Sequence, residues 1–270
     1  MIRSDVHVHT RFCDGEGEPA EFAERAAELG MSSLGFSAHS DTGFDKACAL
    51  KDEAGYITAV NALKAAYKGR LEIALGTEQD FYSGIERENY DYIIGSVHYI
   101  YGEKTGRYYA VDLSAKTLEN FAERECGGDF SQIYLRYYGL VSEMAEKLKP
   151  DVVGHFDLIK KFNKNSRFFD EDSDDYKNAA LAAVRAAAKT GAIFEVNTGG
   201  VSRGYGKEFY PAPFILEEIR RLGASVVLTS DAHSKDNLLY GFERAERELK
   251  ELGFKSVKIL KGGAFADFPI

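Results

Sequence analysis

The chain has 270 residues, of which 44% are hydrophobic and 29% charged, a balance typical of a globular protein rather than a disordered one. Its formal net charge is −9, so nucleic acid, whose phosphate backbone would be repelled, is not an expected partner. No run of about 18 apolar residues is present, so we expect no transmembrane helix and no membrane partner.

The first residues run straight into a strand-like pattern without the apolar stretch of a signal peptide, which predicts a cytoplasmic protein. The three cysteines, Cys13, Cys48 and Cys126, are odd in number and far apart in the sequence. This argues against a disulfide framework and for a reducing compartment. The sequence leaves the oligomeric state open.

Short apolar segments alternate with helical patterns along the whole chain. Strands are expected at Ser4–His9, Ser33–Ser37, Leu71–Thr77, Tyr92–Val97, Val152–His155, Ala192–Asn197, Ser225–Thr229 and, more weakly, Ser256–Leu260. Helices are expected at Glu18–Leu29, Ala54–Tyr67, Leu118–Glu125, Gln132–Leu148, Asp174–Lys189, Phe214–Leu222 and Leu238–Leu252. This alternation indicates a parallel sheet with right-handed crossovers. Seven or eight βα units in a chain of this length predict a single-domain α/β barrel.

One connection, from about residue 99 to residue 149, is much longer than the others. It holds a Tyr/Gly-rich stretch followed by two helical patterns. A long insertion after a barrel strand lies near the face on which active sites are built. We therefore interpret residues 99–149 as a lid or substrate wall within one domain that spans residues 1–270.

The histidines occupy equivalent places in the predicted fold. All six lie at or just past the C-terminal end of an expected strand: His7, His9, His39, His98, His155 and His233. In a barrel those strand ends converge on one face. A single histidine is more often a packed or surface residue than a ligand, but six at equivalent positions indicate a shared site.

Local spacing supports a metal site. His7 and His9 alternate along a strand, so both imidazoles point to the same side. Asp231 and His233 follow an apolar run, and Glu78 follows another strand at the same level. Mixed imidazole and carboxylate ligation suits zinc, manganese or iron. The donors outnumber the needs of one ion, which predicts two or three divalent ions.

Six short motifs contain these residues: D-V-H-V-H-T (5–10), F-S-A-H-S (36–40), G-T-E-Q-D (76–80), G-S-V-H-Y (95–99), V-G-H-F-D (153–157) and S-D-A-H-S (230–234). With these motifs, in this order, the chain resembles the polymerase and histidinol phosphatase (PHP) family over nearly its whole length. The resemblance implies a distorted (βα)7, TIM-like barrel with a trinuclear metal site.

The resemblance also implies the ligands. One metal would be held by His7, His9, Glu78 and Asp231, and Glu78 would bridge to a second metal shared with His98 and the acid of the first loop. The residues His39, His155 and His233 would complete the cluster. The catalytic residues expected are Glu78, Asp231 and His233.

The loop after the first motif departs from the family pattern, because many relatives have a histidine there. In this chain the loop reads T-R-F-C-D-G-E (10–16). We expect Asp14 to replace the histidine, with Glu16 as the alternative. Cys13 could ligate a soft ion, but a small buried thiol is the favoured interpretation.

Within the family, the segment F-E-V-N-T-G-G-V-S-R-G (194–204) and the long insertion resemble most the histidinol phosphatase branch. This implies a metal-dependent phosphomonoesterase that converts L-histidinol phosphate to L-histidinol and phosphate, a step of histidine biosynthesis. Arg203, in a Gly-rich loop after a strand, is the expected phosphate clamp, since a guanidinium fork matches phosphate geometry. Lys160 and Lys161 are weaker candidates.

Three alternatives stay open. Another PHP phosphoesterase, acting on phosphotyrosine or a small phosphorylated metabolite, would use the same ligands. A PHP exonuclease would need a basic groove, which the acidic composition opposes. A non-catalytic PHP module should have lost ligands, whereas this chain keeps a complete set apart from the exchange at Asp14.

Overall fold

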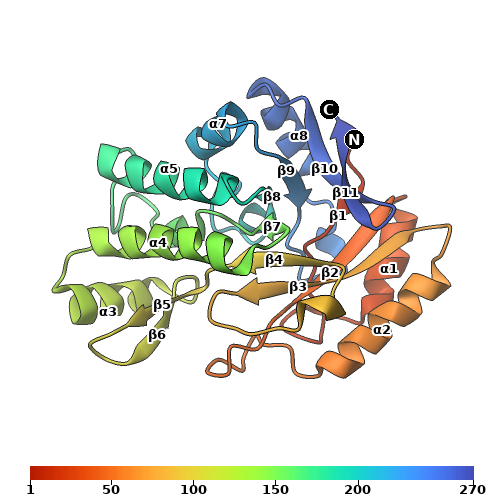
Figure 1. The fold of residues 1–270 in the computed structure, drawn as a ribbon, viewed down its shortest axis with the longest axis horizontal. Helices are drawn as coiled ribbons and strands as arrows, with labels where there is room; N and C mark the ends of the chain where they lie inside the picture. Colours follow the sequence, from red (N-terminus) through yellow and green to blue (C-terminus); the bar gives the residue numbers. More distant parts are fainter.

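The computed structural model describes residues 1–270 and is built around a nine-stranded sheet (Figure 1). Its strands, in spatial order, are β1 (Ser4–Asp5), β2 (Ser33–His39), β3 (Glu72–Asp80), β4 (Tyr92–Ser96), β7 (Val152–Val153), β8 (Ile193–Asn197), β9 (Val226–Thr229), β10 (Ser256–Lys261) and β11 (Ala264–Pro269). The pairs from β1 to β10 are parallel, and β11 is antiparallel to β10.

Helices connect the parallel strands. They are α1 (Pro19–Glu28), α2 (Glu53–Ala66), α3 (Ala115–Cys126), α4 (Ser131–Leu148), α5 (Asp174–Ala188), α6 (Gly199–Ser202), α7 (Pro213–Arg221) and α8 (Phe242–Glu251). Three short 3-10 turns lie at Arg87–Asn89, Leu158–Lys160 and Lys235–Asn237. No helix is long and apolar enough to cross a membrane.

The sheet curls until its first and last parallel strands meet. Beyond β1, Val8 forms a parallel bridge with Ala232; the His9 N–H donates to the Ala232 oxygen at 2.9 Å, and the Ala232 N–H to the His7 oxygen at 3.2 Å. At the opposite end, β10 lies beside β1, with the Leu260 N–H donating to Ser4 Oγ at 3.2 Å. The prediction of an α/β, single-domain, barrel-like fold is confirmed.

Several expected elements differ in detail. The last helix begins at Phe242 rather than Leu238, because Leu239 and Gly241 have positive φ values of 59° and 72° that a helix does not allow. Four elements were not expected: strand β11, the short helix α6, and the strands β5 (Tyr99–Gly102) and β6 (Arg107–Ala110), which form a hairpin. The long connection therefore consists of this hairpin followed by α3 and α4.

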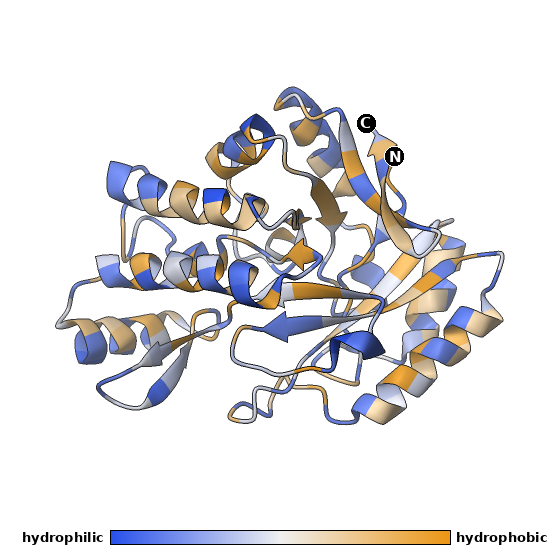
Figure 2. Ribbon diagram, in the orientation of Figure 1, coloured by the Kyte–Doolittle hydropathy of each residue, from blue (hydrophilic) through white to orange (hydrophobic).

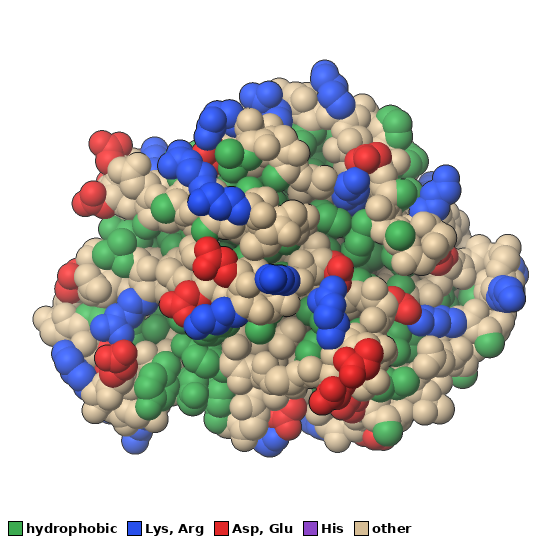
Figure 3. Space-filling model, in the orientation of Figure 1, with side chains coloured by type: hydrophobic (Ala, Val, Ile, Leu, Met, Phe, Trp, Pro, Cys, Tyr) green, Lys and Arg blue, Asp and Glu red, His purple; other side chains and the backbone are tan.

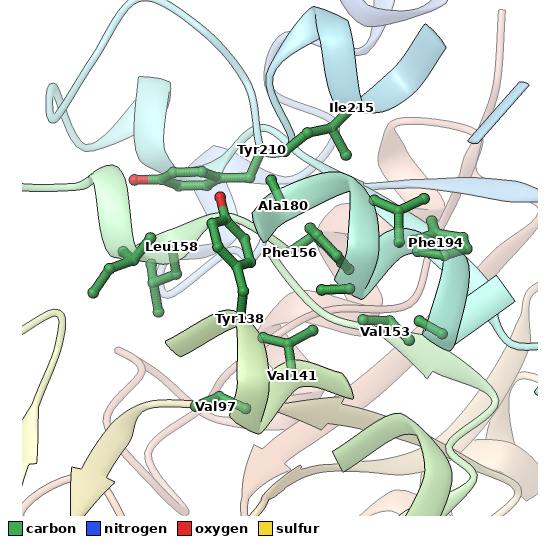
Figure 4. Packing of buried hydrophobic residues seen from close by; sticks show 14 of the residues in the cluster. Val97, Tyr138, Val141, Val153, Phe156, Leu158, Ala180, Phe194, Tyr210 and Ile215 are labelled. Atoms are coloured by element: carbon green, nitrogen blue, oxygen red, sulfur yellow. The ribbon is translucent and has the colours of Figure 1, made fainter. Parts of the chain in front are cut away.

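Apolar stripes on the helices pack against the strands (Figure 2). The largest buried cluster, of 42 residues, joins α4, α5 and α7 to β7 and β8. Figure 4 shows part of it: Tyr138 from α4 lies beside Phe156, which in turn lies beside Phe194. Burial of each such side chain contributes roughly 1.5–3 kcal/mol, so these contacts hold the strand ends in fixed positions.

One tyrosine fixes the barrel interior close to the site. The Tyr92 hydroxyl donates to the Val6 oxygen at 2.6 Å, beside His7. The ring needs a glycine opposite, since a Cβ on Gly76 would lie 2.2 Å from Tyr92 Cζ. This contact ties β4 to the segment that carries His7.

Candidate metal centre and active site

All six imidazoles meet at the C-terminal ends of the parallel strands. Ring centroids lie 5.0 Å apart for His7 and His9, 4.4 Å for His9 and His39, 4.3 Å for His9 and His233, and 5.0 Å for His98 and His155. The structure thus gathers histidines from five different strand ends into one cluster.

Glu78, on β3, lies at the centre of this cluster and is 1% exposed. Its Oε2 lies 3.2 Å from His7 Nε2, 3.5 Å from His9 Nε2 and 2.9 Å from His39 Nδ1. Its Oε1 lies 3.3 Å from His98 Nε2 and 2.8 Å from His155 Nε2, and accepts a hydrogen bond from Ser96 Oγ at 2.7 Å. The two oxygens therefore face two different groups of imidazoles, as a bridging carboxylate would.

Asp231 approaches the same cluster from the segment after β9. Its Oδ1 lies 3.3 Å from His9 Nε2, and its Oδ2 accepts from Arg203 Nη2 at 2.7 Å and from Asn197 Nδ2 at 3.2 Å. Asp231 itself has φ 49°, which Asp tolerates better than most residues. Arg203 and His233 both also contact the Asp231 backbone oxygen, so these three residues form one unit.

Asp14, from the first loop, lies beside His39 and His233. Its Oδ2 is 3.6 Å from His39 Nε2 and 3.3 Å from His233 Nε2. The resemblance implies a metal shared by this acid and His98; in the metal-free structure the Asp14 carboxylate lies nearest to His9, His39 and His233. The reason is local, because Glu16 N–H donates to the His233 oxygen and holds the loop there. The Glu16 side chain is exposed, and Cys13 is buried with its Sγ 3.5 Å from His9 Nδ1.

The donor set fits divalent metal ions. His7 Nε2 and His9 Nε2 are buried without a hydrogen-bond partner, which is costly unless a cation binds there. In a tetrahedral zinc site with bonds of about 2.0–2.1 Å, ligand atoms lie about 3.3 Å apart. The separations of 3.2 Å and 3.5 Å between Glu78 Oε2 and the two imidazoles match this spacing. Three sets of side chains could each hold an ion: His7, His9 and Glu78; His39, Glu78 and His98; and His9, Asp14, His39 and His233.

Electrostatics lead to the same conclusion. Burial, with the neighbouring His233 and His39, lowers the pKa of His9 to about 3, so this imidazole stays neutral as a ligand must. Burial lowers the pKa of His98, but the Glu78 and Asp80 carboxylates together outweigh burial and raise that pKa to about 10. In the metal-free fold, a proton on a histidine such as His98 balances the negative charge of the buried carboxylates. A bound metal ion would replace that proton.

Two further carboxylates accept hydrogen bonds from predicted ligands. Asp80 Oδ2 accepts from the His98 backbone N–H at 2.9 Å and lies 3.3 Å from His98 Nδ1. Glu195, on β8, accepts a hydrogen bond from His7 Nδ1. Both residues lie within the quoted segments of the sequence, but no role was predicted for them; the one signal for Glu195 was an acid between Phe194 and Val196 in a buried strand.

The cluster forms the floor of a cavity of about 260 Å³. Arg203 and Lys161 line it, while Lys160 does not, because its Nζ lies 2.9 Å from the buried Asp157 Oδ2. The long connection contributes Tyr99 and Asp112 to the wall. Of the tyrosines in that connection, Tyr101 and Tyr108 are on the surface (39% exposed each).

Barrel, histidine cluster and central glutamate together define a class of metal-dependent hydrolase domain. A family model described as "PHP domain" matches residues 5–199, and the chain belongs to that family. It is 32% identical to a probable histidinol-phosphatase of Deinococcus radiodurans, over 94% of this chain and 95% of the relative. It is 28% identical to the histidinol-phosphatase of Bacillus subtilis, over 90% of this chain and 98% of the relative.

Solved structures share the fold. A putative histidinol phosphatase from Listeria monocytogenes superposes with a TM-score of 0.75 and 24% identity, covering 89% of this chain and 98% of the other. Histidinol phosphate phosphatase from Lactococcus lactis, complexed with zinc, L-histidinol and phosphate, gives 0.74 and 21%, covering 98% and 100%.

Proposed function

We propose that this protein is a metal-dependent phosphomonoesterase that hydrolyses L-histidinol phosphate to L-histidinol and phosphate. One observation carries the proposal: six imidazoles and the carboxylates of Asp14, Glu78 and Asp231 converge on a cavity that Arg203 also lines. The full-length similarity to histidinol-phosphatases of two bacteria supports this substrate over other phosphomonoesters.

The metal centre would hold two or three divalent ions, with zinc first among zinc, manganese and iron. Its ligands would be His7, His9, Asp14, His39, Glu78, His98, His155, Asp231 and His233. When bound, the ions lower the pKa of water toward about 7 and neutralise the phosphoryl oxygens, the two obstacles to phosphomonoester hydrolysis. Glu78 and Asp231 keep the imidazoles of His7 and His9 aligned, since each carboxylate contacts both.

The phosphate would be held by Arg203. Its side chain is 29% exposed and borders the cavity, and the hydrogen bonds to Asp231 fix the plane of the guanidinium. With its plane fixed in this way, the guanidinium can present its remaining N–H donors to phosphoryl oxygens. Lys161 adds a second cation on the cavity wall, paired with Asp112 at 3.4 Å.

The other end of the substrate carries an amine and an imidazole, for which two carboxylates of the cavity are suited. Asp45 and Asp112 line it, and Tyr99 donates from its hydroxyl to Asp45 Oδ2 at 2.8 Å. Asp45 has no cationic partner within ion-pair distance in the cavity, so it is free to pair with an ammonium group. Asp112 is already paired with Lys161, so Asp45 is the carboxylate that would favour an ammonium group, which supports an amine-bearing phosphate ester.

The experiment is phosphate release from histidinol phosphate by purified protein, before and after a chelator, with single metals then restored. We expect activity to vanish with the chelator and to return with zinc, manganese or iron. Phosphotyrosine and single-stranded DNA serve as comparison substrates at equal concentration. Faster turnover of phosphotyrosine would move the assignment to another PHP phosphoesterase. Absence of all hydrolysis by metal-loaded protein would reject the proposal in favour of a non-catalytic module.

A further inference from the structure

Glu195 is a charged residue with no exposed surface and no place on the cavity wall. It lies on β8 and accepts four hydrogen bonds. Its Oε1 accepts from His7 Nδ1 and from Thr229 Oγ1, the latter at 2.6 Å. Its Oε2 accepts from the His155 backbone N–H and from Asn197 Nδ2, the latter at 3.1 Å. Burying a carboxylate is costly, and four donors offset that cost.

The bond to His7 decides which imidazole nitrogen can bind a metal. With the proton on Nδ1 and shared with Glu195, the lone pair lies on Nε2. That atom is buried, lacks a hydrogen-bond partner, and lies 3.2 Å from Glu78 Oε2. A carboxylate behind an imidazole fixes its orientation and raises its basicity as a ligand.

Glu195 also reaches two other predicted ligands. It holds the backbone of His155 directly. It reaches Asp231 through Asn197, whose Nδ2 lies 3.1 Å from Glu195 Oε2 and 3.2 Å from Asp231 Oδ2. The three ligands follow three different strands, β1, β7 and β9, so one carboxylate connects parts of the site that are far apart in sequence.

We propose that Glu195 is a positioning residue for the metal centre, which sets the tautomer of His7 and aligns His155 and Asp231. This inference rests on the proposed function insofar as it assumes a metal centre at Glu78. It predicts that Glu195 acts on metal affinity without touching the substrate.

The test is the zinc affinity of the Glu195→Gln variant, measured by competition with a chromophoric chelator. Gln has the size of Glu, but its amide N–H₂ group would face the His155 N–H and Asn197 Nδ2, the two donors whose hydrogen bonds Oε2 now accepts. We expect zinc affinity to fall about 10- to 100-fold, the range seen when such outer partners are removed. The matched control is Glu125→Gln. Glu125, on α3, is also buried, at 2% exposure, but it accepts hydrogen bonds from Lys104 and Thr105 of the β5–β6 hairpin rather than from the cluster, so affinity should be unchanged.

A second measurement, on the wild-type protein, does not depend on how well Glu195→Gln folds. In zinc-loaded wild-type protein, long-range ¹H–¹⁵N spectra of the histidine side chains should show a protected proton on His7 Nδ1, identified by its loss in His7→Gln. A His7 proton on Nε2 would overturn the inference, as would a folded Glu195→Gln protein whose zinc affinity is within twofold of wild type. If the wild-type chain binds no zinc, manganese or iron, it is instead the proposed function that fails.

Discussion

Arg203 Nη2 lies 2.7 Å from Asp231 Oδ2, so the one arginine that lines the cavity is bound to a predicted metal ligand. The same guanidinium donates from Nη1 to the Asp231 backbone oxygen at 2.9 Å. The predicted phosphate contact and a predicted metal ligand are therefore hydrogen-bonded to each other, so a substitution at either residue should alter the position of the other.

Replacing Arg203 by Lys should lower kcat/KM for histidinol phosphate by about 10- to 100-fold, because a charge-assisted hydrogen bond is worth about 1.5–3 kcal/mol and Lys lacks the fork. Arg203→Met should lower it further. Steady-state kinetics measure both effects. Arg244→Met is the control, since Arg244 packs over Phe209 outside the cavity. Equal activity of the Lys variant and wild type would contradict a forked contact.

The neighbouring lysines should behave differently. Lys161→Met should raise KM several-fold with little change in kcat, because Lys161 lines the cavity. Lys160→Met should instead lower the free energy of unfolding by roughly 3–5 kcal/mol, because it leaves the buried Asp157 without its cation. Kinetics and urea unfolding of both variants test this. A KM effect confined to Lys160→Met would restore Lys160 as the phosphate contact.

Replacing Glu78 by Gln should reduce kcat by about 100-fold or more, since loss of an outer-sphere partner alone costs 10- to 100-fold. The amide cannot present two anionic oxygens to the two groups of imidazoles. Metal content should fall in parallel, which elemental analysis of the dialysed protein measures. A variant that keeps near-normal turnover and metal content would reject the bridging role.

Metal affinity should rise with pH. The pKa of His98 in the metal-free fold, about 10, lies above its ordinary value of 6.5, so this histidine holds a proton at neutral pH that a metal must displace. The stability that this proton gives the metal-free fold is complete below pH 6.5 and is lost as pH rises through about 10. Calorimetric titration with zinc in two buffers of different ionisation enthalpy, from pH 6 to 8, counts the protons released. A pH-independent affinity without proton release would contradict this.

The barrel and the histidine cluster were predictable because strand ends on one face impose a common location on residues that are distant in sequence. The position of Asp14 in the first loop predicted that it would join the cluster. Its neighbours there, His39 and His233, could not be predicted, because they depend on the backbone hydrogen bond from Glu16 to His233. The role of Glu195 was also hidden, because nothing in a strand sequence shows which buried acid faces an imidazole of another strand. Lys160 and Lys161 are adjacent in sequence, and only a 3-10 turn decides which one reaches the cavity.

The seam between His7–His9 and Ala232 joins the start of the chain to a segment more than 200 residues later. During synthesis on the ribosome, most of the donor residues would be translated long before the last ones, so the complete cluster could form only late. A fragment that stops before His233 lacks the last donor and cannot complete the cluster. Metal uptake should therefore be a late event in biogenesis, and catalytic activity should report the finished fold rather than any part of it.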